Sequence, residues 1–136
     1  MPNGGGPPSC SPRARRSAIS ARVAIAPPIE SWHSHVYFDA ATREVAFALR
    51  ETITRLFAGK MEMGRFHERP VGPHPMFSYQ IAYQPEHFAE IMSWLSVNRG
   101  DLIVFTHPNT GDVIREHRDW AIWMGAKLDL NLDALK

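Results

Sequence analysis

A strand-like alternation followed by a helix-like periodicity sets the strongest limit on the fold of this chain. Residues 33–38 alternate between two kinds of side chain, as in a strand with two unlike faces. The alternation places Ser34, Val36 and Phe38 on one face and His33, His35 and Tyr37 on the other. Apolar residues over 40–58 then recur at helical spacing, with Asp39 as the expected N-cap and Gly59 as the end. The chain therefore begins its folded part as a strand followed by an amphipathic helix.

The rest of the chain continues this pattern. It predicts strands over 60–67, 76–83 and 101–106, a helix from Pro85 to about Gly100, a short helix over 118–124 and an edge strand over 128–132. The order β-α-β-β-α-β predicts an α+β fold of the ferredoxin-like, split βαβ type. In this fold four antiparallel strands carry two helices on one face, so we expect a single domain over residues 30–136.

The other face of such a sheet is open. His33, His35 and Tyr37 would lie on it, provided that Val36 and Phe38 face the helices. An open face must be covered, either by a second subunit or by the C-terminal segment. We therefore expect a homodimer.

Residues 1–29 differ from the rest of the chain in composition. They are rich in Gly, Pro, Ser, Ala and Arg, contain four arginines and no acid, and show no periodicity, which predicts a disordered basic leader. A transit peptide or a misassigned start codon would give a similar segment. The remainder holds 15 − 4 = 11 bases against 14 acids, a formal charge of −3. The only cysteine of the sequence, Cys10, lies in the leader, so no disulfide can form within the chain.

Charge and hydropathy exclude two classes of partner. A formal net charge of +1 argues against a dedicated nucleic-acid binder. No apolar run approaches the roughly 18 residues that a membrane span needs, so we expect no membrane partner and a cytoplasmic protein. Glycine-rich phosphate loops and the Gly-x-Ser-x-Gly motif are absent from the sequence, and Ser34 lies on the opposite strand face from its two histidine neighbours. Nucleophilic hydrolysis is therefore not expected.

Five of the seven histidines fall in three short stretches, 32–35, 72–75 and 107–117. In the predicted topology the first and fourth strands are neighbours, so His33 and His35 would approach His107, and the loop with His74 can fold back over them. Imidazole is the commonest metal ligand among side chains. A structural role instead of metal binding stays open for each histidine taken alone, either at the surface or hydrogen-bonded to a buried tyrosine.

A carboxylate partner is harder to identify. Two histidines and one carboxylate with open positions favour non-haem Fe(II), whereas a structural zinc knot would need thiolates. The acids to consider are Asp39, Glu68, Asp112 and Glu116. None stands out, so an all-histidine site remains open.

Three motifs together resemble the DOPA 4,5-dioxygenase family. They are WHSHVYF at 32–38, GRFHERPVGPHP at 64–75 and HPNTGD at 107–112, and the resemblance runs from about Trp32 to the C-terminus. It implies a small, metal-dependent enzyme that opens the ring of a catechol such as DOPA by extradiol cleavage with O2. The family's histidine-rich segments correspond to His33, His35, His74 and His107.

The resemblance also implies roles for individual residues. We expect His35, His74 and His107 to bind non-haem Fe(II), for which zinc is a possible substitute. A histidine outside the metal shell, His33 or His117, would act as acid and base. Tyr37 would orient the ring, Arg65 would hold the carboxylate of an amino-acid substrate, and His67 would face the substrate.

Two other functions compete with this one. The domain could be a non-catalytic, dimeric module that binds a metal or a small ligand, because one fold hosts many functions. It could also be a zinc lyase or isomerase that uses the same histidines, and such an enzyme would keep its activity without oxygen.

Overall fold

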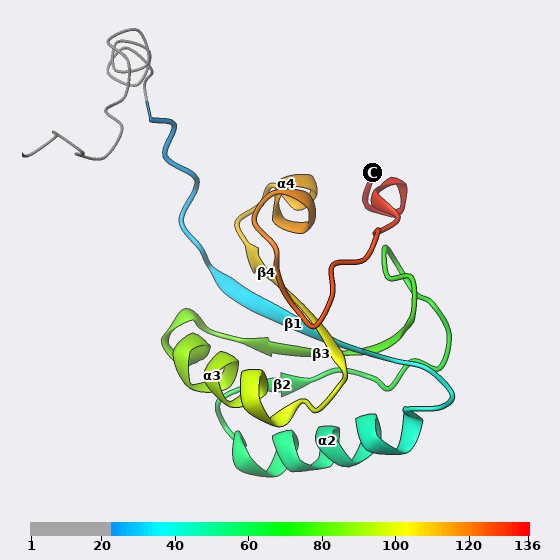
Figure 1. The fold of residues 1–136 in the computed structure, drawn as a ribbon. Helices are drawn as coiled ribbons and strands as arrows, with labels where there is room; N and C mark the ends of the chain where they lie inside the picture. The colour runs from blue at the N-terminus through cyan, green and yellow to red at the C-terminus, as the bar shows by residue number, and fades with distance from the viewer. Residues whose placement is uncertain (1–22) are drawn as a thin grey trace, which may run out of the picture.

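The computed structural model describes residues 23–136, which form one antiparallel sheet with helices on both sides (Figure 1). The strand order is β2-β3-β1-β4-β5. The strands are β1 (Ser31–Phe38), β2 (Glu62–Met63), β3 (Phe77–Tyr83), β4 (Ile103–Asn109) and β5 (Ile122–Met124). β1 is therefore central and pairs along its length with β3 and β4.

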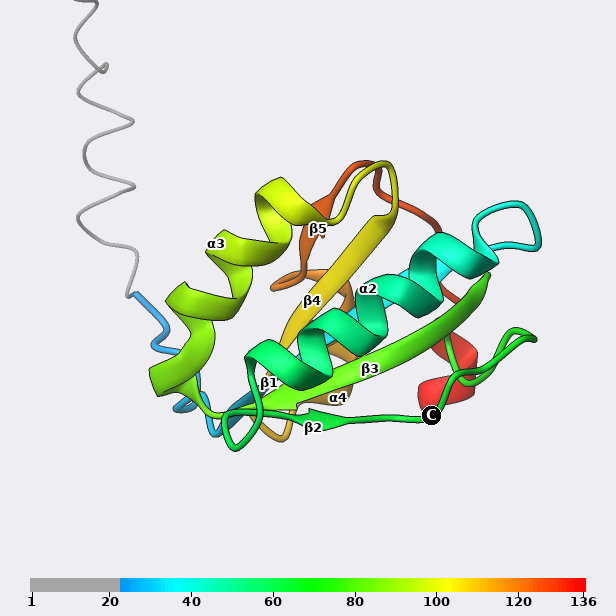
Figure 2. The ribbon, with the colours of Figure 1, turned by 90° about the horizontal axis from the view of Figure 1, so that it is seen from below.

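The helices divide between the two faces of the sheet. α2 (Arg43–Leu56) and α3 (Phe88–Asn98) lie side by side on one face (Figure 2), and the 3-10 turn η1 (Pro85–His87) leads into α3. α4 (Val113–Arg118) and the 3-10 helix η2 (Leu132–Leu135) contact each other on the opposite side (Figure 1). We call the side of α2 and α3 the helical face, and the other side the histidine face.

The hydrophobic core lies on the helical face. Register sets Val36 beside Tyr79 of β3 and Val104 of β4, so one apolar row crosses three strands. All three side chains are fully buried, and they pack with the buried stripes of α2 and α3, which include Ile53 and Leu95. The predicted inward direction of Val36 and Phe38 is thus confirmed, because both belong to this core.

The core also contains a small polar cluster. Ser34 Oγ lies 2.8 Å from both Tyr83 Oη and Thr106 Oγ1, and the Thr106 hydroxyl lies 3.4 Å from Met92 Sδ. These bonds satisfy hydroxyls that would otherwise be buried without partners. They also link β1, β3, β4 and α3.

Several predicted elements differ from those observed. The first helix begins at Arg43 with Thr42 as N-cap, and Asp39 instead closes the turn before it by accepting a bond from Thr42 N (2.9 Å). The second predicted strand is reduced to two residues followed by an isolated bridge at His67. β4 extends three residues beyond the predicted end.

The predictions for the C-terminal third were wrong in detail. The helix lies over Val113–Arg118 rather than 118–124, and the last strand is Ile122–Met124 rather than 128–132. Asp112 starts the helix, since its side chain accepts a bond from Arg115 N (3.2 Å). The sheet has five strands, and β5 takes the place of the edge strand that was predicted over 128–132 beside a four-stranded sheet. The ferredoxin-like assignment stays a prediction.

The histidine face is covered by segments of the same chain. α4, η2 and the loop between β2 and β3 rise from that side of the sheet (Figure 1), and Asn131 N donates to Pro73 O at 2.9 Å. Of the two covers predicted for the open face, the structure shows the C-terminal segment, and the homodimer stays a prediction. Most of the predicted leader lies outside the described residues; 23–30 are exposed and have no regular secondary structure. No helix over residues 23–136 is long and apolar enough to cross a membrane.

Candidate metal centre

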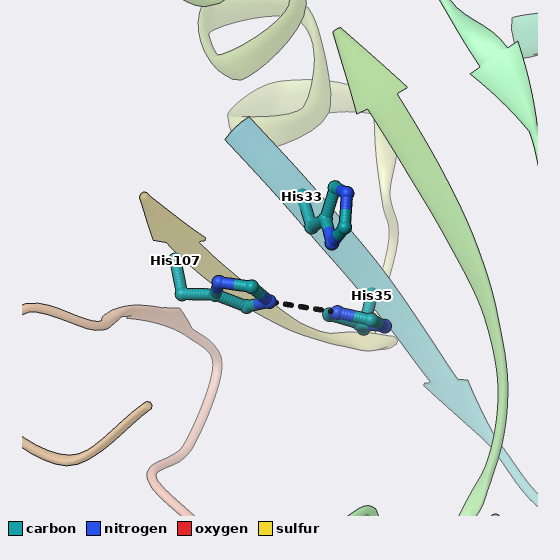
Figure 3. A group of neighbouring side chains, drawn as sticks. All are labelled: His33, His35 and His107. Atoms are coloured by element: carbon teal, nitrogen blue, oxygen red, sulfur yellow. Dashed lines mark hydrogen bonds between the residues drawn. The ribbon is translucent and has the colours of Figure 1, made fainter. Parts of the chain in front are cut away.

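Strand register brings the histidines of β1 and β4 together on one face. His33 is paired with His107, and His35 with Phe105, so their side chains project side by side from neighbouring strands. Figure 3 shows the three imidazoles of His33, His35 and His107 converging above the two strands. The predicted approach of the first and fourth strands is confirmed.

The closest contact in this group joins His35 and His107. Their Nε2 atoms lie 3.2 Å apart, and both side chains are buried. His33 lies closer to solvent and meets the ring of His107 edge-on, with 5.2 Å between centroids. One ligand atom from each of the three histidines falls within 4.8 Å of the others.

Backbone carbonyls fix the tautomer of two histidines. His107 Nδ1 lies 3.1 Å from Pro108 O, and His117 Nδ1 lies 2.7 Å from Val113 O. A carbonyl can only accept, so each Nδ1 carries the proton and each Nε2 keeps its lone pair in the neutral ring. Such outer hydrogen bonds are typical of metal-binding histidines.

His74 enters the group from the loop between β2 and β3. Gly72 has φ of +54°, a conformation that favours glycine, and His74 N donates to Val71 O at 3.0 Å to close the turn. The imidazole then lies 4.2 Å from the ring of His35, and its Nδ1 is 2.7 Å from Tyr37 Oη. The loop therefore folds back over the strands as the sequence predicted.

α4 supplies a fifth histidine and a carboxylate. The ring of His117 lies 4.0 Å from the ring of His107, and Glu116 beside it is buried. Glu116 Oε2 accepts bonds from Thr110 N, Thr110 Oγ1 and Gly111 N, which hold the carboxylate against the turn after β4. His107, Glu116 and His117 form a second group whose ligand atoms lie within 4.8 Å of one another.

The other three acids considered from the sequence have structural partners instead. Asp39 bonds to Thr42, Glu68 pairs with Arg43, and Asp112 caps α4. Glu116 is thus the acid that the fold brings to the histidines. Sequence reasoning did not single it out, because the helix was placed five residues too late and Glu116 lay in the preceding loop.

Burial keeps these histidines neutral. Burial lowers the pKa of His107 to about 3 and that of His74 to about 4, and the neighbouring imidazoles add to both shifts. The pKa of His35 falls well below its usual value for the same reasons. The pKa of His33 is also lowered, by burial first and His117 second, whereas Glu116 opposes the shift. At neutral pH these imidazoles are in the form that binds metals.

The donor set fits a transition metal. Two nitrogens bound to one ion at about 2.0–2.1 Å lie about 2.9 Å apart at a right angle and about 3.3 Å apart at a tetrahedral angle. The observed 3.2 Å between the two Nε2 atoms falls between these values. Imidazoles with one carboxylate in reach suit iron or zinc, and no thiolate is present among the described residues to make a structural zinc knot.

The predicted site residues thus separate into two sets. The structure brings six of them together: His33, His35, Tyr37, His74, His107 and His117. His67 pairs with Ser78, which itself pairs with Tyr37, so His67 lies on the same face two strands away from Tyr37. Arg65 is exposed, and no hydrogen bond or ion pair links it to another described residue. Sequence reasoning also missed Phe105 and Trp123, whose rings pack 4.7 Å apart, with Phe105 beside the histidines.

Two cavities adjoin the histidine cluster on different sides. A cavity of about 480 Å³ lies over β2 and β3 and has His33 in its wall. A smaller one of about 220 Å³ lies between α4, β5 and residues 127–132, with His117 and Trp123 in its wall. The first falls within the size range of small-molecule sites.

Comparison with known proteins gave concordant matches. The model of the "Dopa 4,5-dioxygenase family" matches residues 32–134. A DOPA 4,5-dioxygenase of Amanita muscaria is 37% identical over 76% of this chain, and an uncharacterized 21.2 kDa protein of Botryotinia fuckeliana is 40% identical over 75% of it. The matched region spans 49% and 61%, respectively, of these two longer proteins. The crystal structure of a proposed dioxygenase from Nostoc punctiforme superposes with a TM-score of 0.73 at 40% identity, and the match covers 79% of this chain and 91% of that one.

Proposed function

The chain belongs to the Dopa 4,5-dioxygenase family, and on this premise we propose that it opens the ring of a catechol by extradiol cleavage with O2 at a histidine-bound non-haem metal. The observation that carries the proposal is the convergence of His33, His35 and His107 from paired positions of β1 and β4. Burying or half-burying three imidazoles in one place costs free energy of folding, and this cost is explained if the imidazoles bind a ligand.

The metal would be held by His35 and His107, with His33 as the third ligand. This choice rests on the 4.8 Å grouping of their ligand atoms, in which His74 does not take part. The set expected from the sequence was His35, His74 and His107. Loss of the metal in H33A but not in H74A would favour His33 as the third ligand, and the reverse result would favour His74. Bound Fe(II) would supply the redox chemistry by which dioxygen reacts with a catechol ring.

His117 is the best-placed proton acceptor in this scheme. Its Nδ1–H is anchored on Val113 O, so its Nε2 lone pair is free to take a phenolic proton and return it later. Its ring lies 4.0 Å from that of His107, next to the metal ligands, and it forms part of the wall of the smaller cavity. The general acid and base would therefore lie outside the metal shell.

Tyr37 has a supporting part. Burial raises the pKa of its phenol far above neutral, so the hydroxyl stays protonated and can hold His74 by the 2.7 Å bond. Together the two residues close the histidine face on the side of the β2–β3 loop. This closure would limit the access of water to the buried rings of His35 and His74.

The test combines metal analysis with oxygen uptake. Protein purified without oxygen is loaded with Fe(II), and oxygen consumption is recorded with a panel of catechols while the absorbance of a yellow ring-opened product is followed. We expect one equivalent of iron and one O2 consumed per catechol cleaved. Protein that binds no iron and consumes no oxygen with any catechol would contradict the proposal, and turnover that persists under nitrogen would point to a lyase instead.

A further inference from the structure

The larger cavity has its floor in the same sheet row as the metal site. Register aligns His107 of β4, His33 of β1, Ala82 of β3 and Glu62 of β2 side by side across the sheet. Residues in one row of an antiparallel sheet project from the same face. The small side chain of Ala82 therefore leaves a trough between an imidazole of the cluster at one end and a carboxylate at the other, and His33, Ala82 and Glu62 all line the cavity.

The length of the trough suits a phenyl ring with a short side chain. Neighbouring strands lie about 4.8 Å apart, so His33 and Glu62, two strands apart, are separated by roughly 10 Å along the row. A catechol whose hydroxyls lie at the histidines would extend its side chain over Ala82 toward Glu62. A two-carbon side chain that ends in a charged group spans the remaining distance.

The charge at the far end is negative. Glu62 makes no ion pair with any described residue, and Glu86, also in the wall, lies 3.8 Å from His87 Nε2. Lys60 lines the same cavity, but its Nζ is bound to both carboxylate oxygens of Glu90 at 2.9 and 3.0 Å. The positive charge of Lys60 is thus compensated, whereas the negative charge of Glu62 is not.

We propose that this trough binds the cationic amine end of the substrate and that Glu62 determines specificity for catechols that carry an ammonium group. The inference rests on the proposed function for the ring end alone. No contact with the carboxylate of an amino-acid substrate is required, so an arylethylamine should be accepted as well as an amino acid. Arg65, expected from the sequence to hold that carboxylate, is not part of the cavity wall.

Three catechols with the same ring separate the charges. Dopamine carries only the ammonium, DOPA carries both groups, and 3-(3,4-dihydroxyphenyl)propionate carries only the carboxylate. Binding to the iron-loaded protein is measured by calorimetry under nitrogen, where no turnover occurs. We expect dopamine to bind at least about tenfold more tightly than the propionate at low ionic strength, and the ratio to shrink in 0.5 M salt because the trough is partly open to solvent.

Substitution of Glu62 then tests the assigned residue. E62Q should reduce the ratio about fivefold, the effect of one partly exposed ion pair, and E62K should reverse the preference. E51Q on the exposed side of α2 is the matched control, and its ratio should equal that of the unaltered protein. An unchanged ratio in E62Q, or a preference for the propionate that is lost in R65Q, would overturn the inference.

The same measurements distinguish the two proposals. Oxygen uptake with all three catechols at equal kcat/KM would refute the charge selection and leave the dioxygenase proposal standing. A Glu62-dependent preference in binding without any oxygen uptake would refute the dioxygenase and support the amine site.

Discussion

The two faces of the sheet are built from the same strands and serve different ends. Val36 on the helical face pairs with apolar neighbours and is buried against α2 and α3. His35, one residue earlier, points the other way and lies against His107 and His74 under a cover of loops and short helices. Both are buried, but the first gains from burial while the second must remain neutral to tolerate it.

Stability and chemistry therefore depend on different faces of the sheet. The helical face holds the long helices and the contiguous hydrophobic core, so it should carry most of the free energy of unfolding. The histidine face holds the histidine cluster, and both cavities adjoin that cluster, so this face should carry the activity. Substitutions on the two faces should therefore separate the two properties.

The largest expected effect is on the activity of H107A. Loss of this imidazole removes a ligand that both candidate groups share, so iron content should fall and kcat/KM should drop at least about a thousandfold, about 4 kcal/mol of transition-state stabilisation. Its cost to the free energy of unfolding should stay below about 2 kcal/mol, since within residues 23–136 the ring hydrogen-bonds only to His35 and to Pro108 O. Metal analysis and urea unfolding measure both. A folded H107A variant that keeps its iron and a tenth of its activity would contradict the assignment of activity to the histidine face. T54A, exposed on α2, is the control.

The converse substitution is I53A, on the helical face. Ile53 is fully buried in the core, and its truncation should lower the free energy of unfolding by about 2–5 kcal/mol. Because α2 does not touch the histidine cluster, kcat/KM of the remaining folded protein should stay within twofold when assayed in the cold. L56A, half exposed on the same helix, should cost less than about 0.5 kcal/mol. Equal losses in the two variants would show that the core is not where we place it.

Acid should destabilise the histidine face selectively. In metal-free protein the pKa values of His74 (about 4) and His107 (about 3) lie below the ordinary 6.5, so the unfolded chain takes up protons first as pH falls. Stability present above pH 6.5 should therefore be lost as pH falls to about 4 for His74 and to about 3 for His107, by up to about 1.4 kcal/mol per pH unit for each histidine. Urea unfolding at a series of pH values measures the slope. H74A should flatten it, and an identical slope in that variant would contradict the assignment.

A smaller effect is expected where the two faces meet. Thr106 precedes His107 but points to the helical face, where it bonds Ser34. T106V removes that bond at nearly constant volume and should cost about 1 kcal/mol in urea unfolding, with iron content and kcat/KM unchanged within twofold. A tenfold loss of activity would mean instead that the buried hydroxyls position the metal ligands, and the separation of the faces would be incomplete.

The sequence predicts the first half of the site well. Alternation over 33–38 is local and strong, so it places His33 and His35 on one face and Val36 and Phe38 on the other, as observed. The pairing of β1 with β4 follows from the predicted order of strands and helices. The loop proline and glycine before His74 likewise predict the turn that returns this residue to the sheet.

The C-terminal third is where sequence reasoning fails. Leucines at 128, 130 and 132 imitate an exposed strand, while the three-residue β5 is too short to show any period. The burial of Glu116 depends on backbone donors of the turn at Thr110 and Gly111, a contact that no local pattern reveals. Tertiary packing, not propensity, decides the structure of this segment.

Because β1 is the central strand, the alternation of its side chains positions both the site and the core. A single residue inserted into or deleted from β1 would exchange its two faces, turning Ser34 and Val36 toward the histidine face and His35 into the apolar core. Length changes in this strand would thus destroy fold and activity together. A length change in the loop over 68–70, which lies outside the strand ladder, would leave the alternation of β1 unchanged.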